Sequence, residues 1–421
     1  MSSIIKYLKS AIFNLLNNLT TRLFFKNNKL GIISGKMLQL LSRNKYRIVK
    51  LDFTENLINR TNLIESNLSY IYTVAELSKP SEKIYKNQSS IGYNIVPNGT
   101  VDPISPMVLF ENKLYKQNYI ASHPDKNVNY RTKLIIQATA GYAFIKMIRP
   151  TIELEQGIFL SGHWPHNWYH WLIEILPKRE VYEFLPKKYK NYPLLIPEKI
   201  KNLKNHTIVL NQLFPNATVI YLKDIHWYKI EDLVWLDSPV ISSPDFKYKR
   251  ANFNILDTNL NWELMKTFKK RLLNAEKNLS PKRRIFLARN QDKRAYNQNE
   301  VYEMLKKYDF ESVYFENLTP EEQINTMNNT NFIVGPTGAA WANLIFCNEY
   351  IKGVIWMPDI VRNANIYANL AQLSKINLVH YYYPCKSDDW IEFMNSNETV
   401  VINTNKLEEI IINLLDTKLN D

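Results

Sequence analysis

Cysteine and glycine are both scarce in this chain, and the shortage of cysteine restricts what it can be. Its 421 residues include ten glycines and two cysteines, Cys347 and Cys385. Two cysteines cannot build a disulfide framework or a structural zinc cluster, so the disulfide-rich and zinc-finger classes are excluded. So few cysteines are typical of a reducing compartment, and we expect a cytoplasmic location.

Long apolar runs are missing as well. No uninterrupted apolar stretch reaches the roughly 20 residues of a transmembrane helix, and the start lacks the apolar core and cleavage site of a signal peptide. Residues 1–30 do carry leucine and isoleucine at helical spacing beside lysine and arginine. This amphipathic segment predicts either peripheral contact with the inner face of an anionic cytoplasmic membrane, or packing on the protein's own core or a partner subunit.

Acidic residues are fewer than basic residues in this chain. The chain has 53 lysines and arginines against 40 aspartates and glutamates, a formal net charge of +13. Such a balance favours anionic partners such as nucleotides, acidic sugars, nucleic acid or anionic lipid, without choosing among them. Because no clustered basic and aromatic surface is evident in the sequence, we expect no nucleic-acid partner.

Several short catalytic and binding motifs are also missing. The chain has no full GxGxxG fingerprint, Walker lysine, GxSxG, HExxH or CxxC. Its adjacent acidic pairs, Asp388-Asp389 and Glu231-Asp232, lack the Asp-X-Asp pattern and strand context of a metal–nucleotide-sugar site. We therefore expect no cofactor and no obligatory metal.

What the sequence does have is a sustained alternation of strand and helix patterns. It runs from Leu264 to Tyr382 and predicts a parallel, doubly wound sheet. A similar alternation begins near Gly157, after a less regular start. We predict an α/β protein with two Rossmann-like, doubly wound domains facing a cleft. Its parts are an amphipathic segment at 1–30, an acceptor-side α/β domain at 31–250 and a nucleotide-sugar-binding domain at 251–421.

The stretch VGPTGAA, residues 334–340, predicts a turn from a strand into a helix. Gly338 begins that helix and, having no Cβ, lets a ligand approach the backbone. Free N–H groups and the helix dipole at such a position favour a phosphate. A tight turn with no ligand is the alternative.

Two arginines follow a strand in PKRRIFLARNQDKR, residues 281–294. Arg289 and Arg294 should lie at the same sheet edge as Gly338, since carboxyl ends of parallel strands share an edge. Guanidinium groups bind phosphates through two parallel hydrogen bonds. The alternative is a solvated basic loop.

A third segment, HWPHNWYHWLIEILPKR at 163–179, is rich in histidine and tryptophan. In a helix, Asn167, His170 and Glu174 would share one face. His170 and Glu174 are spaced to form a general-base pair, whereas zinc lacks a third ligand nearby. A helix of packing aromatics, with His170 buried in the core, is the alternative.

Together these segments resemble glycosyltransferase family 61, which includes bacterial capsular polysaccharide biosynthesis proteins. The resemblance extends from about residue 157 to about residue 384. The matching positions are Asn167, His170, Trp171, Leu172 and Glu174; Arg289, Arg294, Asn299 and Glu300; and Val334, Gly335, Pro336, Thr337, Gly338, Ala339 and Asn343.

This resemblance implies a GT-B-like fold, a nucleotide-activated sugar donor and inversion at the anomeric carbon. It implies that the donor binds the second domain and the acceptor largely the first, beside Asn167 and Trp171. The implied donor-binding residues are Arg289, Arg294, Glu300, Gly335, Thr337, Gly338, Ala339 and Asn343. Thr337 stands where many members have a histidine, so a role that depends on that histidine does not carry over.

We predict an inverting, metal-independent hexosyl- or pentosyltransferase of capsular-type, cell-surface polysaccharide biosynthesis. Its partners would be a nucleotide sugar and a glycan or lipid-linked glycan acceptor. Either His170 or Glu174 would take the acceptor proton, and the spacing does not decide between them. The alternative is a non-catalytic nucleotide- or glycan-binding scaffold of a polysaccharide assembly complex.

Overall fold

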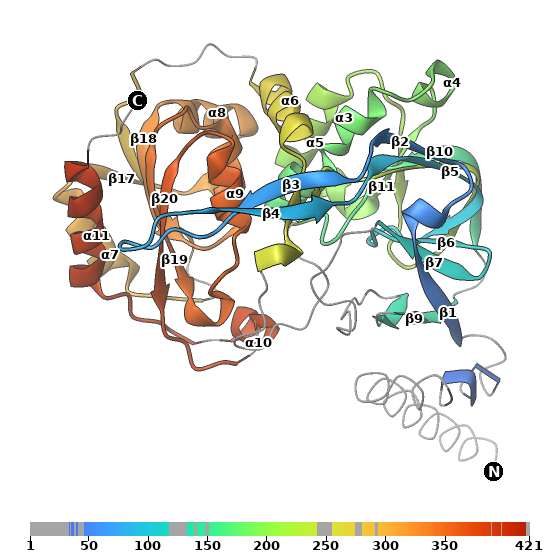
Figure 1. Ribbon diagram of the computed structural model, residues 1–421, viewed down its shortest axis with the longest axis horizontal. Coiled ribbons are helices and arrows are strands. Elements are labelled where there is room, and N and C mark those ends of the chain that lie inside the picture. Colours follow the sequence, from blue (N-terminus) through green and yellow to red (C-terminus); the bar gives the residue numbers. More distant parts are fainter. Residues whose placement is uncertain are drawn as a thin grey trace.

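The computed structural model describes residues 33, 35–37, 39–40, 46–117, 132, 134–138, 141–147, 151–241, 255–273, 280–290, 294–388, 390–396 and 398–417. The predicted amphipathic segment at 1–30 lies outside these described residues. Figure 1 shows two lobes side by side, each built on its own sheet. The α/β prediction is confirmed.

The first lobe contains a mixed sheet of eleven described strands. Their order is β12 (Val219–Leu222), β11 (Leu194–Pro197), β10 (Ile152–Phe159), β13 (Tyr228–Leu236), β5 (Ile91–Val101), β6 (Val108–Phe110), β7 (Lys113–Lys116), β1 (Tyr46–Phe53), β9 (Tyr142–Lys146) and β8 (Ile135–Ala138), with β2 (Arg60–Ile64) paired to β5. Strands β12, β11, β10 and β13 are parallel neighbours, whereas β13 and β5 are antiparallel. The parallel, doubly wound arrangement expected for this half is therefore found only among β10, β11, β12 and β13.

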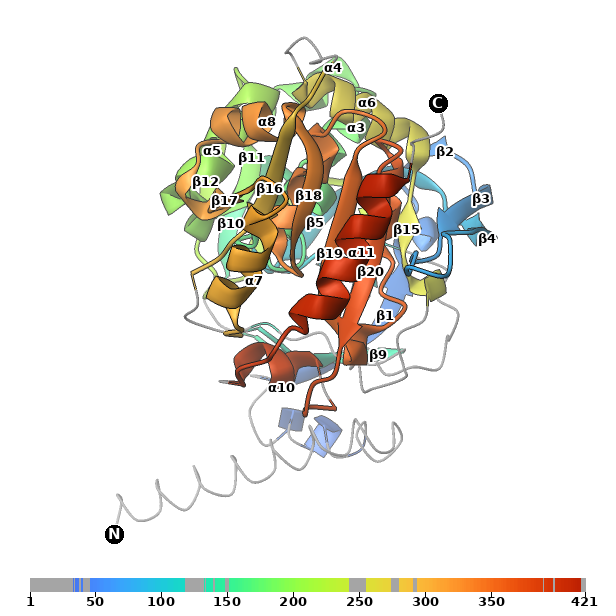
Figure 2. The same ribbon diagram turned by 90° about the vertical axis from the view of Figure 1, so that its left-hand side faces the viewer.

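The second lobe contains a five-stranded sheet in which every pairing is parallel. Its order is β17 (Phe310–Val313), β16 (Arg283–Leu287), β18 (Thr330–Pro336), β19 (Lys352–Pro358) and β20 (Asn377–Tyr383). Helices α7 (Gln298–Lys306) and α11 (Thr404–Asp416) cover one face (Figure 2), while α8 (Pro320–Asn328), α9 (Ile366–Gln372) and the 3₁₀ helix η6 (Ala339–Phe346) lie toward the first lobe. This is the parallel, doubly wound sheet that the sequence predicts for this half.

Local sequence explains several of these boundaries. Thr319 caps α8, and Glu322 completes a capping box by accepting from the Thr319 backbone N–H. Helix α9 begins only at Ile366, because Asn363 has a φ of 78° and interrupts the helical backbone before it. Only a 3₁₀ turn, η7 (Asp359–Val361), precedes α9 there.

The remaining elements are short and mostly belong to the first lobe or the connection. They are η1 (Thr54–Asn56), the π-helix η2 (His170–Ile175), α3 (Lys178–Tyr182), α4 (Lys187–Lys190), η3 (Glu198–Asn202), α5 (Lys204–Leu213), β14 (Val240–Ile241), η4 (Ile255–Asp257), β15 (Asn259–Leu260), α6 (Trp262–Leu272), η5 (Phe315–Asn317) and α10 (Trp390–Asn395). Within the described ranges, no helix has the length and apolarity needed to cross a bilayer.

A hairpin from the first half of the chain packs on the second lobe. Strands β3 (Asn67–Tyr72) and β4 (Lys83–Gln88) extend across the front of the molecule in Figure 1. Tyr70 stacks on Trp262 of α6 at 5.2 Å between ring centroids, and Asn365 donates to the Tyr72 carbonyl at 2.8 Å. One hydrophobic cluster also runs through both lobes. The lobes are therefore joined by packing and not only by the chain connection, while the predicted division at residue 250 stays a prediction.

Candidate active site

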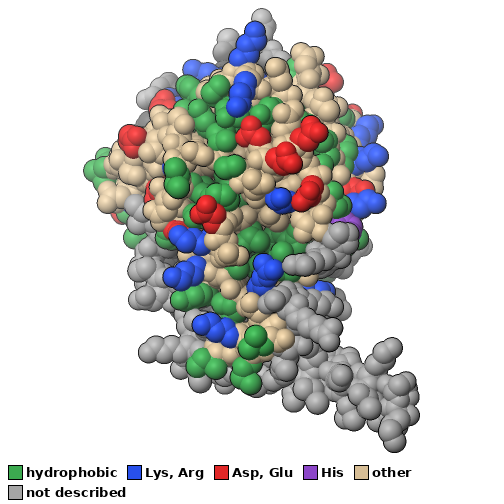
Figure 3. Space-filling view, turned by 90° about the vertical axis from the view of Figure 1, so that its right-hand side faces the viewer, with side chains coloured by type: hydrophobic (Ala, Val, Ile, Leu, Met, Phe, Trp, Pro, Cys, Tyr) green, Lys and Arg blue, Asp and Glu red, His purple; other side chains and the backbone are tan. Residues whose placement is uncertain are grey.

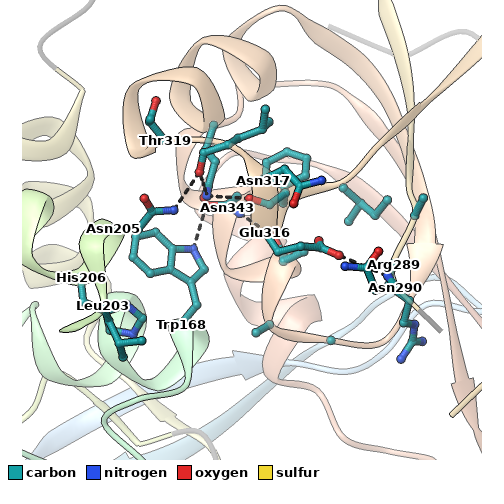
Figure 4. Close-up of a pocket in the computed structure, with 18 of the residues that line it drawn as sticks. Trp168, Leu203, Asn205, His206, Arg289, Asn290, Glu316, Asn317, Thr319 and Asn343 are labelled. Carbon is teal, nitrogen blue, oxygen red and sulfur yellow. Dashed lines mark hydrogen bonds between the residues drawn. The ribbon is translucent and has the colours of Figure 1, made fainter. Parts of the chain in front are cut away.

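A cavity of about 690 Å³ lies between the lobes. Its second-lobe wall comes from the loops after β16 and β18 and from residues 315–319, and its first-lobe wall comes from Trp168 and residues 202–206. In Figure 4, Arg289 and Asn290 are at one end, Trp168 and Leu203 are at the other, and Asn343 and Glu316 lie between them. The cavity is large enough for a nucleotide-sized ligand.

The position of this cavity follows from the order of the second sheet. Strand β17 lies beside β16 on one side of the sheet and β19 lies beside β18 on the other, so the connections that leave β16 and β18 run in opposite directions. Ligands of open parallel sheets bind beyond the carboxyl ends of strands at such a reversal. Leu287 ends β16, Pro336 ends β18, and both line the cavity.

Two arginines enter the cavity without an acidic partner among the described residues. Arg289 and Arg294 both line it, and the Arg289 Nε atom is buried without a hydrogen bond. Burial first, and the charge of Arg294 second, lower the pKa of Arg289 to about 10, so it stays protonated at neutral pH. Burial also lowers the pKa of Arg294. Two adjacent, partly desolvated cations form a site whose charge an anion would balance.

The backbone of Arg289 is held by a residue that the sequence analysis did not identify. Gln298, at the start of α7, accepts from the Arg289 N–H at 3.1 Å and donates to the Arg289 carbonyl at 3.2 Å. Tyr296 donates its hydroxyl to the same Gln298 oxygen at 2.9 Å and lies 5.7 Å from the Arg289 guanidinium carbon. These contacts fix the loop that carries the guanidinium.

The turn after β18 supplies the neighbouring part of the wall. Thr337, Gly338 and Ala339 line the cavity, and η6 starts at Ala339. Thr337 is 4% exposed, and its N–H donates to the Trp356 carbonyl at 2.9 Å. The Tyr367 hydroxyl donates to the Gly338 carbonyl at 3.1 Å. The residues that begin η6 therefore line the same cavity as the arginines, and the first N–H groups of a helix have no partner within it.

The two glycines of this turn have different roles. A Cβ at Gly335 would lie 2.7 Å from the Leu287 Cβ, so β18 needs glycine there to pack against β16. A Cβ at Gly338 would meet no heavy atom nearer than 4.0 Å, and its φ of 171° is open to any residue. Gly335 does not line the cavity, whereas Gly338 does.

Glu300 lies apart from the other donor-binding candidates. It is exposed in the first turn of α7, where it accepts from the Asn297 side chain at 2.7 Å and from Thr404 at 3.4 Å. Asn343, in contrast, lines the cavity and accepts from the Trp168 indole N–H at 3.2 Å. That bond joins the two lobes, as does the bond from Asn205 to the Leu318 carbonyl at 2.8 Å.

His170 and Glu174 form the predicted pair on η2. The distance from His170 Nδ1 to Glu174 Oε2 is 2.5 Å, and the two side chains are 14% and 12% exposed. In η2 the Leu176 N–H reaches the Trp171 carbonyl at 2.9 Å, one residue beyond an α-helical bond. Such π-helical turns occur frequently at functional sites. With Glu174 on Nδ1, the Nε2 atom of His170 is the one left to exchange a proton.

A buried polar layer lies beneath this pair. Lys178 is 4% exposed, and its ammonium donates to the Ser161 carbonyl at 2.6 Å. Burial lowers the pKa of Lys178 to about 8, against the opposing effect of Asp237 and Glu174. Asp237 is itself paired with Arg60 at 2.7 Å, with side chains 0% and 5% exposed. Positive charge thus lies within electrostatic range of the Glu174 carboxylate.

His170 and Glu174 are not among the residues that line the cavity. Aromatic contacts link the pair to the cavity. The ring centroid of Tyr169 lies 5.8 Å from that of His170 and 5.6 Å from that of Tyr367, whose hydroxyl donates to the Gly338 carbonyl. Asn167 accepts from the Tyr169 N–H at 2.9 Å. Trp171 is fully buried and donates to the His206 carbonyl at 3.2 Å, so it belongs to the core.

Residues 168–354 match the family model described as Glycosyltransferase 61. The resemblance to glycosyltransferase family 61 is confirmed. The family 61 segment starts at the tryptophan of the first-lobe wall, ends in β19 and contains both arginines, the His170–Glu174 pair and the Gly338 turn. No curated protein matches this chain.

The family 61 segment also contains cavity residues that sequence reasoning missed. They are Trp168, Asn202, Leu203, Lys204, Asn205, His206, Leu287, Ala288, Asn290, Phe315, Glu316, Asn317, Leu318, Thr319, Gln323, Pro336 and Ala340. Trp168 was within a segment already singled out, but its neighbour His170 carried the more evident chemistry. The 202–206 and 315–319 loops have no motif, and only the packing of the lobes brings them together.

In the part of the chain that the structure describes, no three His, Cys, Asp or Glu side chains gather in a way that could hold a metal ion. The expectation that no metal is obligatory stays a prediction.

Proposed function

We propose that this protein is an inverting, metal-independent glycosyltransferase of GT-B-like arrangement. It moves a hexosyl or pentosyl group from a nucleotide sugar to a glycan or lipid-linked glycan acceptor, in capsular-type cell-surface polysaccharide biosynthesis. The family match supports glycosyl transfer in general. The observation that carries the proposal is the cavity at the β16–β18 reversal, into which two arginines project that have no acidic partner in the part of the chain that the structure describes.

The arginines and the η6 start suit the diphosphate of the donor. Negative charge grows on that diphosphate as the bond to the anomeric carbon breaks, and preorganised donors stabilise it most at that moment. Arg289 and Arg294 supply fixed positive charge, and Ala339 begins η6 with its N–H groups unpaired within the helix. Thr337 lies beside them as a neutral hydroxyl, so the positive charge next to this turn comes from the arginines, while Lys204 lines the first-lobe wall.

Gly338 supports close approach of the donor to the backbone. Neither its φ nor any neighbouring atom excludes a side chain at this position in the free protein. A ligand against the N–H groups of η6 would occupy the space into which a Cβ projects. We therefore assign the requirement for glycine at 338 to the bound donor and the requirement at 335 to strand packing.

His170 is proposed as the base, with Glu174 as the group that orients it. The carboxylate on Nδ1 favours the tautomer whose Nε2 lone pair is available, and it stabilises the imidazolium that forms. Nε2 would take the acceptor hydroxyl proton while that oxygen bonds to the anomeric carbon. The bond from this carbon to the phosphate oxygen breaks at the same time, and the nucleoside diphosphate leaves with the electron pair.

Location and partners follow from the sequence more than from the fold. We propose a cytoplasmic protein, with peripheral membrane contact through residues 1–30. Nucleic acid is not favoured as a partner. On the face of the first lobe in Figure 3, described acidic and basic side chains are interspersed and form no continuous basic surface.

A non-catalytic nucleotide- or glycan-binding scaffold is the second candidate. The observation that favours it is that His170 and Glu174 do not line the cavity. A scaffold would bind the nucleotide through Arg289 but would not transfer sugar. Turnover therefore separates the two candidates, and nucleotide binding alone does not.

The test is calorimetric titration of the full chain with UDP, GDP, ADP and dTDP, followed by transfer assays with the corresponding nucleotide sugars. Arg289→Ala should weaken the tightest-binding nucleotide by at least tenfold, the usual scale for a lost charged phosphate contact. Arg283→Ala is the matched control, since Arg283 is at the opposite end of β16 and pairs with Glu311. Equal nucleotide affinity in the wild type and in Arg289→Ala would contradict the proposal.

A further inference from the structure

Trp164 is the most exposed tryptophan of the chain. All nine tryptophans are in the described residues, and Trp164, at 41%, is the one that falls among the exposed large hydrophobic side chains. Five of the others are at most 2% exposed. A solvent-exposed indole is unusual in a chain that buries most of its tryptophans, and it indicates a ligand-binding surface.

The backbone at Trp164 is in a strained conformation. Trp164 has a φ of 42°, in the left-handed region that bulky residues rarely adopt. Pro165 follows and restricts the Trp164 backbone further. The Asn167 N–H donates to the Trp164 carbonyl at 2.9 Å and closes the turn. Strain of this kind persists where the surrounding structure requires a particular side-chain position.

The Trp164 indole lies beside His170, the proposed base. His163 stacks against the indole, with ring centroids 4.9 Å apart and planes 22° apart. His170 meets it edge to face at 6.0 Å and 87°. Burial lowers the pKa of His163 to about 3, with a further contribution from His170, so the supporting ring is neutral at physiological pH. A neutral ring can back the indole without repelling the imidazolium that forms on His170.

We propose that Trp164 is a stacking platform for a pyranose ring of the acceptor glycan, next to His170. The inference rests on the proposed function, because His170 marks where the acceptor hydroxyl must lie. A pyranose presents a face of C–H groups that packs on the negative face of an aromatic ring, while its hydroxyls stay at the edge. Trp164 therefore selects a cyclic acceptor sugar and positions its hydroxyl for deprotonation.

The neighbours of Trp164 favour a sugar over a lipid chain. His166 is exposed and Asn167 is half-buried in the same turn, so polar groups border the indole. One apolar ring edged by hydrogen-bonding side chains matches a polyhydroxylated ring, whereas an acyl chain needs a continuous apolar surface. Trp164 also precedes the family 61 segment, which begins at Trp168.

Saturation-transfer NMR on the full chain tests this platform. The probes are the methyl pyranosides of glucose, galactose, mannose, xylose, rhamnose and N-acetylglucosamine. At least one should receive saturation at its ring C–H protons, with the effect lost in Trp164→Ala and partly kept in Trp164→Phe. Phe184→Ala is the control, because Phe184 is also exposed, at 59%, but lies beyond α3.

Three outcomes separate the platform from the proposed function. Sugar contact that depends on Trp164, together with nucleotide binding that depends on Arg289, supports both. Nucleotide binding with no sugar contact, or with equal contact in Trp164→Ala, overturns the platform and leaves the transferase proposal standing. Sugar contact at Trp164 without any nucleotide binding supports the platform and contradicts the transferase proposal. With an identified acceptor, Trp164→Ala should raise the acceptor KM about tenfold and leave the donor KM unchanged.

Discussion

The second-lobe wall of the cavity and the polar layer of the first lobe hold their charges differently. Arg289 and Arg294 project into the cavity with no acidic partner among the described residues. In the first lobe, His170 has Glu174 at 2.5 Å and Arg60 has Asp237 at 2.7 Å. Charges without a partner are free to bind an external anion, whereas charges already paired hold a geometry. The comparison separates the residues that we propose for donor binding from those that we propose to position the base.

The largest effect is expected at His170. His170→Ala should lower kcat by about 1000-fold, within the usual range for a lost general base, and should leave donor affinity nearly unchanged. Glu174→Gln should lower kcat less, because the amide oxygen can still accept from Nδ1. Steady-state kinetics with separate donor and acceptor titrations measure both. A large loss of donor affinity in His170→Ala would break the division between the two regions.

The buried Arg60–Asp237 pair should matter most for stability. Arg60→Met leaves a buried carboxylate unpaired, which should lower the free energy of unfolding by about 3–5 kcal/mol. Urea unfolding measures this, with Lys229→Ala as the control. Lys229 pairs with Glu153 on the surface, and its loss should cost less than about 1 kcal/mol. If Arg60→Met is as stable as the control, the buried ion pair does not contribute to the stability of the first lobe.

A pH-dependent loss of stability is expected from His380 on β20. It is 2% exposed, and burial lowers its pKa to about 4. Between pH 6.5 and about 4 the unfolded chain binds this proton and the folded chain does not, so stability falls as pH falls. The contribution is about 1.4 kcal/mol per pH unit.

Urea unfolding of the wild type and of His380→Phe isolates this slope. Burial raises the pKa of Asp102 to about 6, which acts in the opposite direction, but Asp102 is present in both proteins and cancels. The stability difference should be flat above pH 7 and should shift in favour of the variant below pH 6. A difference that does not vary with pH would contradict the assignment.

The smallest effect is expected from the bonds that join the cavity walls. Trp168→Phe removes the indole N–H that Asn343 accepts, and should weaken nucleotide binding by about fivefold, the scale of one neutral hydrogen bond. Asn205→Ala removes a second bond between the cavity walls and should have an effect of similar size. Calorimetric titration compares them. A tenfold larger effect from Trp168→Phe would mean that Trp168 contacts the nucleotide directly.

The second lobe could be predicted from sequence because its signals are local. The capping box at Thr319 and the strand at Ile333 and Val334 each depend on a few neighbouring residues. The rule that strand ends share an edge then brought Arg289, Arg294 and Gly338 together. Gly335 and Gly338 could not be distinguished, because the difference lies in the approach of Leu287 from another strand.

The first lobe was predicted less well because its contacts are non-local. Strands β2 to β7 form antiparallel pairs and a hairpin whose exposed faces carry little periodic signal. The packing of Tyr70 on Trp262 joins segments almost 200 residues apart, and no sequence window contains both. The separation of His170 from the cavity lining likewise depends on how the lobes meet.

The central claim is that the loops after β16 and β18 bind the diphosphate of a nucleotide donor. A crystal structure with the nucleoside diphosphate that binds tightest in titration tests it directly. We predict phosphate oxygens within hydrogen-bonding distance of the Arg289 and Arg294 guanidinium groups and of the backbone N–H groups that begin η6 at Ala339. A nucleotide bound elsewhere, or one whose phosphates point away from both arginines, would contradict the account.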